Sequence, residues 1–406
     1  MPNLDHHIRE YRNGRDLTER PRGVLVIDLH GLTADDVRQG FPTVYQHLLE
    51  RVKPERDLNP RPKRRDFWWR FAEDQPRLRF SLEGLPRYIA TGQVSKHRVF
   101  QWLDGSILPD DKLIAIASGD ALHMGVLTSG VHVVWALASG GTLEDRPVYS
   151  KSTCFEPFPF PSDDTGLTPE LTTCIRALAE QLDAHRKTQQ AAHPDLTLTG
   201  IYNVLEKLRH GEPLTAKDKL IHELGLVSVL KSLHDELDAA ALAAYGWSDL
   251  GAALADHAHA EARAAAVDEL LQRLVALNAR RAAEEAAGHV RWLRPDFQTR
   301  GRHTQTVMDV STAPAAEEAE KDSAEPAAAA AAALPKRPWP TGLPEQIKAV
   351  AEVLASAGRP FTPADLEARF TARGRWRDRL PVILETLEAL GRARRAPGVL
   401  PRWQGS

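Results

Sequence analysis

The sequence of 406 residues is poor in cysteine, with only Cys154 and Cys174. They lie either side of a Pro-rich stretch and share no metal-ligand spacing, so neither a disulfide framework nor a zinc site is indicated. We expect both to be reduced, structural residues. No run of about 18 apolar residues occurs, and the first fifteen residues are polar and charged where a secretory signal needs an apolar segment. A cytoplasmic location, with no membrane partner, is therefore expected.

Several motifs of common enzymes are also missing. The sequence contains no P-loop, no Gly-rich dinucleotide turn and no nucleophile elbow for a Ser-His-Asp triad. These absences argue against nucleotide hydrolysis, dinucleotide-dependent redox chemistry and serine hydrolysis. We accordingly expect no catalytic residue, cofactor or metal in this chain.

The charge is unevenly distributed along the chain. A formal net charge of −3 argues superficially against a nucleic-acid partner, because phosphate binding needs a positive field. Residues 51–100, however, hold thirteen Lys and Arg against six Asp and Glu. Acidic residues elsewhere hide this basic region.

The N-terminal part predicts an α+β domain over residues 1–161. Short apolar runs bounded by turn residues predict strands at 23–28, 87–90, 98–103, 112–117 and 131–135. Thr33 is placed to cap a helix over 33–53, whose apolar residues recur at helical spacing. The domain should end at 155–161, where alternating prolines can neither continue a helix nor donate to a sheet.

The rest of the chain predicts three further parts. Residues 162–302 have helical periodicity and predict an α-helical domain. Residues 303–335, rich in Ala, Glu and Pro, predict a flexible, disordered linker. Helices expected at 343–357, from Thr362 and at 379–390 make residues 336–406 resemble a small winged-helix domain. From Arg359 onward this part has ten Arg against five Asp and Glu, so it suits DNA contact and protein docking about equally.

Residues 63–71 interleave cations with large aromatic residues. A surface that neutralises phosphates and stacks on bases needs this combination. Lys63, Arg64 and Arg65 are therefore candidate DNA contacts, with Trp68 or Trp69 as a stacking residue. The alternative is that Trp68, Trp69 and Phe71 are core residues while the arginines face solvent, since aromatic residues dominate protein cores.

A second basic run, residues 95–98, lies between two predicted strands. Lys96, His97 and Arg98 can present donors to phosphate oxygens or to guanine, and Arg87, at the start of a neighbouring strand, is included in the same candidate set. A run this short is more often a solvated loop.

Two other groupings are weaker. Asp104, Asp110, Asp111 and Lys112 superficially resemble a metal-dependent nuclease site, but they crowd around one Leu-Pro turn, which favours a charged turn. His123 and His132 have no diagnostic spacing in what reads as β-type sequence, so we expect partly buried, hydrogen-bonded histidines.

Several longer strings resemble the target-recognition region of large single-chain, adenine-specific DNA methyltransferases. The similar proteins are the type IIL (MmeI-like) restriction-modification enzymes and the methyltransferase of DISARM phage defence. The resemblance runs in order over residues 8–298, about three quarters of the chain. The strings that carry it are 11–17, 22–28, 49–56, 85–91, 94–100, 107–110, 153–161, 198–205, 233–238, 244–247 and 291–295.

The resemblance implies sequence-specific binding of double-stranded DNA while one adenine is flipped out for methylation at N6. Such enzymes carry, upstream, an S-adenosylmethionine-binding domain with an Asn-Pro-Pro-Tyr or Asn-Pro-Pro-Phe motif. Neither motif is present, and the only Asn-Pro pair, Asn59-Pro60, continues as Arg61-Pro62. We therefore expect S-adenosylmethionine only in a missing catalytic domain, with a split gene, a truncation or a separate catalytic chain as the explanation. Alone, this chain is expected to be inactive.

Two alternatives stay open at this stage. The chain also fits a non-catalytic DNA-binding or scaffolding subunit of a restriction-modification or phage-defence complex, with other subunits as partners. A nuclease is a poorer third choice, which would need Asp104 and Asp111 to share a divalent ion.

The candidate contacts give a first prediction. If Arg64 and Lys96 bind phosphate, then Arg64→Ala and Lys96→Ala should each weaken binding to every duplex sequence. Each should also lower the slope of affinity against salt by about one unit. A salt-dependent binding titration measures both, and unchanged affinity in both variants would show that the assignment is wrong.

Overall fold

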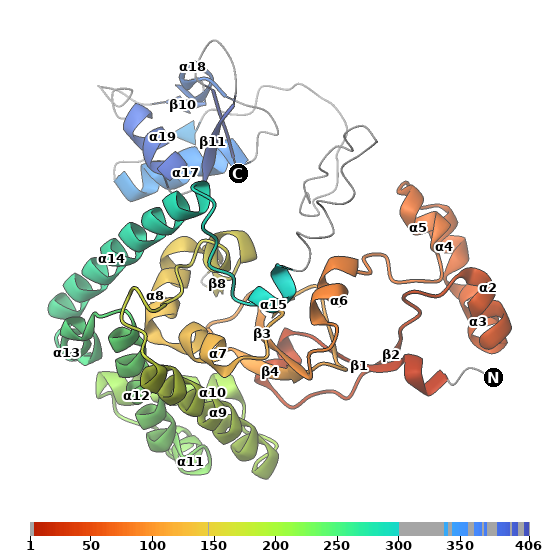
Figure 1. The fold of residues 1–406 in the computed structure, drawn as a ribbon, viewed down its shortest axis with the longest axis horizontal. Coiled ribbons are helices and arrows are strands. Elements are labelled where there is room, and N and C mark those ends of the chain that lie inside the picture. The colour runs from red at the N-terminus through yellow and green to blue at the C-terminus, as the bar shows by residue number, and fades with distance from the viewer. Residues whose placement is uncertain are drawn as a thin grey trace. The chain divides into compact units, whose positions relative to one another are not determined.

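In the computed structural model, the described residues are 4–144, 146–299 and, near the C-terminus, 337–339, 343–355, 361–367, 369–371, 380–389, 392–396 and 402–405. The chain divides into two compact units, residues 1–303 and 304–406. Figure 1 shows small sheets among many helices, so the α+β class expected from the sequence is confirmed.

Two small sheets organise the N-terminal part of the first unit. In one, β3 lies between β4 and β6 and is antiparallel to both; in the other, β1 lies between an antiparallel β2 and a parallel β5. A separate hairpin consists of β7 and β8. The strand bounds are β1 Ile8–Arg12, β2 Leu25–Ile27, β3 Arg87–Gly92, β4 Gln101–Asp104, β5 Leu108–Pro109, β6 Leu113–Ile116, β7 Gly141–Leu143 and β8 Arg146–Val148.

Four of the expected strands are confirmed within shifted bounds, and the fifth is wrong. Residues 131–135 belong to a helix, α8 (Gly130–Ser139). Its run of β-branched residues is typical of a strand, but the segment is buried on several sides by neighbouring helices. A helix in such surroundings can be apolar all round, and local propensity then no longer decides the structure.

The expected helix over residues 33–53 begins as predicted and then breaks. Thr33 caps its first turn, and its hydroxyl and the Asp36 carboxylate form a reciprocal capping box. The helix stops at Phe41, because Pro42 lacks the N–H that a continuous helix needs and restricts the residue before it. The segment folds as short helices: α2 Ala34–Gly40, α3 Pro42–Arg51 and α4 Lys53–Asp57, followed by α5 Pro62–Asp66 and α6 Pro76–Leu82.

Longer helices form the remainder of the first unit, which confirms the helical periodicity. Threonines at 168, 197 and 215 accept hydrogen bonds from the first turns of three of them. The described helices are α1 Gly14–Thr18, α7 Ala121–Thr128, α8, α9 Pro169–Ala192, α10 Leu198–His210, α11 Ala216–Leu224, α12 Val227–Ala244, α13 Gly251–Ala255, α14 Ala260–Ala286 and α15 Pro295–Gln298, with single-turn helices at Leu4–His7, Lys151–Phe155 and Ser248–Leu250.

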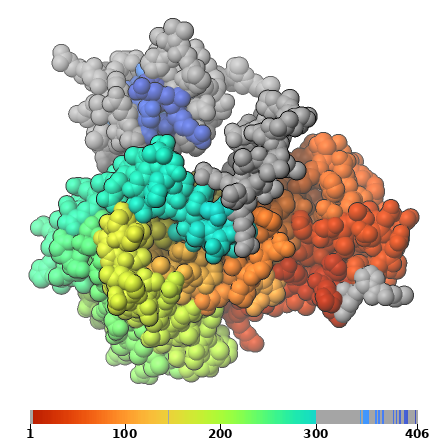
Figure 2. Space-filling view, viewed as in Figure 1, coloured from red at the N-terminus to blue at the C-terminus, as the bar shows by residue number. Residues whose placement is uncertain are grey.

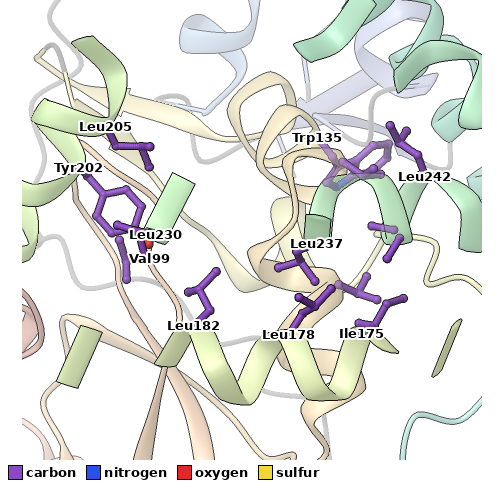
Figure 3. Close-up of a cluster of buried hydrophobic side chains, with 14 of the residues drawn as sticks. Val99, Trp135, Ile175, Leu178, Leu182, Tyr202, Leu205, Leu230, Leu237 and Leu242 are labelled. Atoms are coloured by element: carbon purple, nitrogen blue, oxygen red, sulfur yellow. The ribbon is translucent and has the colours of Figure 1, made fainter. Parts of the chain in front are cut away.

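One hydrophobic core crosses the expected boundary at residue 161. Figure 3 shows Val99 and Trp135 in the same cluster as Leu178, Leu230 and Leu237 from the long helices. Phe158, inside the Pro-rich stretch, is buried in this cluster as well. Burying each such side chain contributes about 1.5–3 kcal/mol, so the two parts stabilise each other. The domain boundaries themselves stay a prediction.

A buried guanidinium ties the sheet to the helices. Arg186 of α9 is 1% exposed and donates to the carbonyl of Phe100 (2.8 Å) and to the Tyr202 hydroxyl (3.1 Å). The same hydroxyl lies 2.9 Å from His234 Nε2 on α12. The contacts therefore join the start of β4, α9, α10 and α12.

In the second unit, the expected helices at 343–357 and 379–390 appear as α17 (Leu343–Ala355) and α19 (Leu380–Ala389), and Thr362 caps α18 (Pro363–Glu367) through Asp365. Its strands are β9 Arg337–Pro338, β10 Phe370–Thr371, β11 Ala393–Ala396 and β12 Arg402–Gly405. These elements enclose a core of their own. The expected linker, 303–335, lies outside the described residues.

Both cysteines are free thiols, Cys154 buried and Cys174 exposed. Taken singly, no helix among the described residues has the length and apolar composition to cross a membrane. The bent pair α7 and α8 reaches these criteria only when the two helices are combined.

The buried His132 predicts an acid-sensitive fold. Its Nε2 lies 2.9 Å from the Tyr149 hydroxyl, and burial, helped by the charge of Arg98, lowers its pKa to about 3. In the unfolded chain the pKa of this histidine is about 6.5. Below that pH the unfolded chain binds a proton that the folded chain does not, so the free energy of unfolding is unaffected by His132 above about pH 6.5 and declines as the pH falls. We expect this residue to account for about 2 kcal/mol of the loss in unfolding free energy between pH 7.5 and 5.

Urea unfolding of the wild type and His132→Leu at both pH values measures this effect. The variant should lose less stability on acidification, whereas the exposed His6→Leu should behave as the wild type. An identical pH dependence in all three proteins would contradict the assignment.

Candidate nucleic-acid interface

The three cations of the first basic run lie on or next to α5 and each has a partner within the chain. Lys63 pairs with Asp74 (Nζ to Oδ1, 3.0 Å) and Arg64 with Glu73 (Nη2 to Oε1, 2.8 Å). Arg65 donates to the carbonyl of Asn59 at 2.7 Å. Glu73 is exposed, so the partner of Arg64 stays exchangeable, whereas Asp74 beside Lys63 is nearly buried.

Which of the neighbouring aromatic residues are buried and which are exposed differs from the prediction. Trp68 is 7% exposed and packs edge-on against Tyr45 and Trp69, so it is not available to stack on a base. Trp69 is half-buried and donates its indole N–H to the carbonyl of Leu32. The core interpretation is thus correct for Trp68. The exposed aromatic rings of this run are Phe67 and Phe71.

Arg87 acts within the fold. Its guanidinium lies 3.9 Å from the ring centre of Trp102 and forms an ion pair with Glu180 of α9. It also donates to the carbonyl of Gly119. Its donors are therefore directed at the protein, and a DNA contact would have to break these bonds.

Arg98 is likewise turned inward. It donates to the carbonyl of Gly92 and to the Thr91 hydroxyl, and its guanidinium lies over the ring of Tyr149. Burial lowers its pKa to about 10, so it remains a cation at neutral pH. It serves the packing of this loop, which corrects the expectation that it faces DNA.

Lys96 and His97 meet one side chain of α10. Lys96 Nζ and His97 Nε2 lie 2.6 and 2.9 Å from Asn203 Oδ1. The His97 ring is nearly buried, whereas the side chain of Lys96 is 56% exposed. Of the second basic run, Lys96 is therefore the cation at the surface.

Lys96 borders a groove of about 480 Å³, here called the basic groove. Four cations line it, each from a different segment: Arg15 on α1, Lys96, Lys112 after β5, and Arg146 on β8. Each of them has an exposed acid beside it: Glu19 for Arg15, Glu206 for Lys96, Asp111 for Lys112 and Glu144 for Arg146. Because these pairs are solvent-exposed, a phosphate can replace the acid at low cost.

Local hydrogen bonds fix the walls of this groove. Asn13 caps α1 and so positions Arg15, while Asp16 binds Arg22 in a two-pronged contact that lowers the pKa of Asp16 to about 2. Asp110, which also lines the groove, accepts from the Tyr11 hydroxyl at 2.5 Å and from the backbone N–H of Lys112 at 2.8 Å.

The β7–β8 hairpin carries the fourth cation. Its base is attached to residues 93–98 through the Val94–Val148 bridge and a bond from the Ser95 N–H to the carbonyl of Pro147. Its tip is exposed, and Glu144 there adopts a positive φ of 57°. Strained backbone of this kind costs about 1–3 kcal/mol and is concentrated at functional sites.

Sequence reasoning missed Arg15 and Arg146 and considered Lys112 only for a nuclease. Pro147 was an available signal, because proline within a strand marks an edge or a hairpin. The sequence does not show that four separate segments converge on one groove. A second hollow, of about 300 Å³, shares Leu17 and Gln101 with the basic groove and adds Arg12, Arg20 and Lys187 to the positive surface.

The acidic cluster and the two histidines form hydrogen bonds within the fold. Asp104 accepts from Ser106, and Asp110 from Tyr11 as above. His123 and His132 lie on α7 and α8, not on strands, and bond to Ser118 and Tyr149. Within the residues that the structure describes, no three His, Cys, Asp or Glu side chains gather as a metal site.

Comparisons with known proteins agree with part of this reading. The model of the family described as MmeI, target recognition domain, matches residues 2–162, which confirms the resemblance expected from the sequence for that part. A solved structure of the type IIL restriction-modification enzyme MmeI in complex with DNA is similar at 18% identity and a TM-score of 0.47, covering 67% of this chain and 32% of that one. This chain thus spans about a third of the length of that enzyme. No curated protein matches the chain.

The inward and outward cations of residues 95–98 should respond differently to substitution. Arg98→Ala leaves the carbonyl of Gly92 and the Thr91 hydroxyl without a donor, so we expect the unfolding free energy to fall by about 2 kcal/mol. Lys96→Ala, its exposed neighbour, should stay within about 0.5 kcal/mol of the wild type. Equal stability of the two variants in urea unfolding would show that Arg98 is not structural.

Proposed function

We propose that residues 4–162 recognise a short sequence in double-stranded DNA, with the basic groove as the contact surface. The observation that carries the proposal is the convergence of Arg15, Lys96, Lys112 and Arg146 on one groove, within the region that matches the target-recognition model. Cations from four segments can follow a phosphate backbone, which supplies most of the affinity of DNA-binding proteins.

The groove offers both kinds of contact that sequence recognition needs. Lys96 and Lys112, as flexible point charges, suit phosphate oxygens. Arg146 lies on an exposed two-stranded ribbon, and the major groove of DNA admits such a ribbon. Its planar fork matches O6 and N7 of guanine, so we assign base reading to Arg146 and positioning to the lysines.

Catalysis belongs elsewhere in this proposal. S-adenosylmethionine enzymes of this type bind the cofactor at a parallel sheet with a Gly-containing turn, whereas β3 here is antiparallel to β4 and β6. Asn59-Pro60 lies in an exposed turn before α5, and the Asn59 carbonyl is occupied by Arg65. The described residues therefore do not fit the cofactor. Adenine-N6 methylation, in a restriction-modification or DISARM-like defence system of the cytoplasm, would be performed by a separate domain or chain.

The second unit is proposed to be a winged-helix domain. Its described elements follow in the order β9, α17, the bridging residue Phe361, α18, β10, α19 and the β11–β12 hairpin. Two backbone bonds between Phe361 and Trp403 attach the hairpin to the segment between α17 and α18, as the strands of a winged helix require. The support is this topology together with the Arg-rich composition.

A second candidate function is a non-catalytic scaffolding subunit of a defence complex. It is favoured by exposed apolar residues around the α11–α12 corner: Leu220, Leu226 and Val229. Copurification of another subunit, lost in Leu220→Asp and Val229→Asp but kept in Arg146→Ala, would favour this role.

The proposed division between lysine and arginine can be tested by salt-dependent titration with duplex DNA. Lys112→Ala should weaken binding to all sequences and lower the salt slope by about one unit, whereas Arg146→Ala should cost about 1–3 kcal/mol on cognate sequences and relax one base position. Lys231→Ala, on α12, is the surface control and should bind as the wild type.

A parallel assay with labelled S-adenosylmethionine separates recognition from catalysis. Binding without methyl transfer is expected of this chain alone. Methyl transfer by the purified chain would contradict the proposed division of labour, and affinity unaffected by either groove substitution would contradict the groove assignment.

A further inference from the structure

A helical arm, residues 29–82 with helices α2 to α6, extends from one side of the first unit. Figure 1 shows α2, α3, α4 and α5 as a lobe apart from β3 and β4, and Figure 2 shows the same red and orange lobe at one end of that unit. Its centre is a small cluster of Leu29, Val37 and Phe41 with Tyr45 and Trp69 around them. The arm thus has its own packing and a large surface for its size.

Three phenylalanines of this arm are exposed, Phe67, Phe71 and Phe80, and of these Phe80 packs against Phe297 of α15. Phe67 and Phe71 are 43% and 44% exposed, on either side of the buried Trp68. The Arg70 guanidinium lies 5.2 Å from the ring centre of Phe67. Phe71 makes no ring contact with any residue that the structure describes. Neither Phe67 nor Phe71 belongs to the core cluster of the arm, so both rings are available to a ligand.

The cations of the arm favour a polyanion. Arg51, Arg56 and Arg77 form no ion pair with a described residue, and Arg61 is held by Glu73, whose side chain is 56% exposed. Exposed cations and exposed aromatic rings on the same arm match a nucleic acid, whose phosphates and base or sugar edges are presented together. An acidic or purely apolar protein surface would match only one of the two features.

Strand β1 connects the arm to the basic groove. At its start, His7 packs against Phe41 of the arm, and at its end Asn13 caps the helix that carries Arg15. Its five residues span roughly 17 Å, about the length of five base pairs. A duplex held in the groove and running along β1 would therefore reach the arm.

We infer that the arm is a second contact for double-stranded DNA, next to the recognised sequence. Arg51, Arg56 and Arg77 bind phosphates, and Phe67 and Phe71 contact sugar and base edges in the minor groove. The inference rests on the proposed function, because the groove must hold the duplex for the arm to reach it. It adds a contact that reads no sequence but increases affinity.

Photocrosslinking with the full chain tests the position of the arm. With p-benzoylphenylalanine in place of Phe71, irradiation should crosslink the protein to a labelled duplex of mixed sequence, about 20 base pairs long. The same group in place of Leu220, an exposed residue of α11, should give no crosslink. If the chain binds the duplex by anisotropy but residue 71 does not crosslink, the inference is overturned and the proposed function stands. If the chain binds no duplex, both fail.

Affinity measurements test whether the contact matters. Phe71→Ala should weaken duplex binding about fivefold or more, and Arg77→Ala should lower the salt slope by about one unit. Leu58→Ala, which removes the most exposed apolar side chain of the same arm, is the matched control and should bind as the wild type. Thermal unfolding of each variant checks that the arm stays folded, and Phe67→Ala gives a second test. Wild-type affinity in both phenylalanine variants would overturn the inference.

Discussion

The buried Arg186 guanidinium is the contact on which the first unit depends. It lies on α9, where an unpaired charge would cost several kcal/mol, and it is compensated by the Phe100 carbonyl, the Tyr202 hydroxyl and a carboxylate of its own helix, Asp183. Because each partner comes from a different element, the guanidinium fixes β4, α9 and α10 relative to one another. One groove cation, Lys96, is held by this framework directly, since its Nζ lies 2.6 Å from Asn203 Oδ1 on α10. The helices thus support this part of the recognition surface.

This support explains why so many cations of the N-terminal part are unavailable to a ligand. Arg87, Arg98 and Arg186 each hold a loop or strand in place by donating to backbone carbonyls or carboxylates, which an arginine fork does better than a lysine. Arg98 also reaches the carbonyl of Pro147 at 3.4 Å, so it helps to position the segments that carry Lys96 and Arg146. Internal cations thus support part of the positive surface in this fold.

Much of the fold was predictable from local chemistry. Thr33 and Thr362 were identified as caps from sequence, and the strands around residues 87–90 and 112–117 follow from apolar runs between turns. The failures came from tertiary context. Residues 131–135 form a helix because neighbouring helices bury them, and the break at Pro42 was overlooked in an otherwise regular apolar pattern. The candidate site was only partly predictable: composition located the basic region, but whether Lys96 or Arg98 faces outward depends on which carbonyls the folded chain leaves without a donor.

The helical arm shows the same limit of prediction from sequence. In residues 63–71 the sequence predicts that a tryptophan stacks on a base, because tryptophans offer the largest rings. A small core, however, uses its largest rings first: Trp68 packs beside Tyr45, and Trp69, together with Arg70, donates to the carbonyl of Leu32. Only the smaller rings, Phe67 and Phe71, are then left at the surface. In a lobe with so few buried residues, the largest aromatic side chains are needed for internal packing. A binding role is then left to the side chains that lie outside the core.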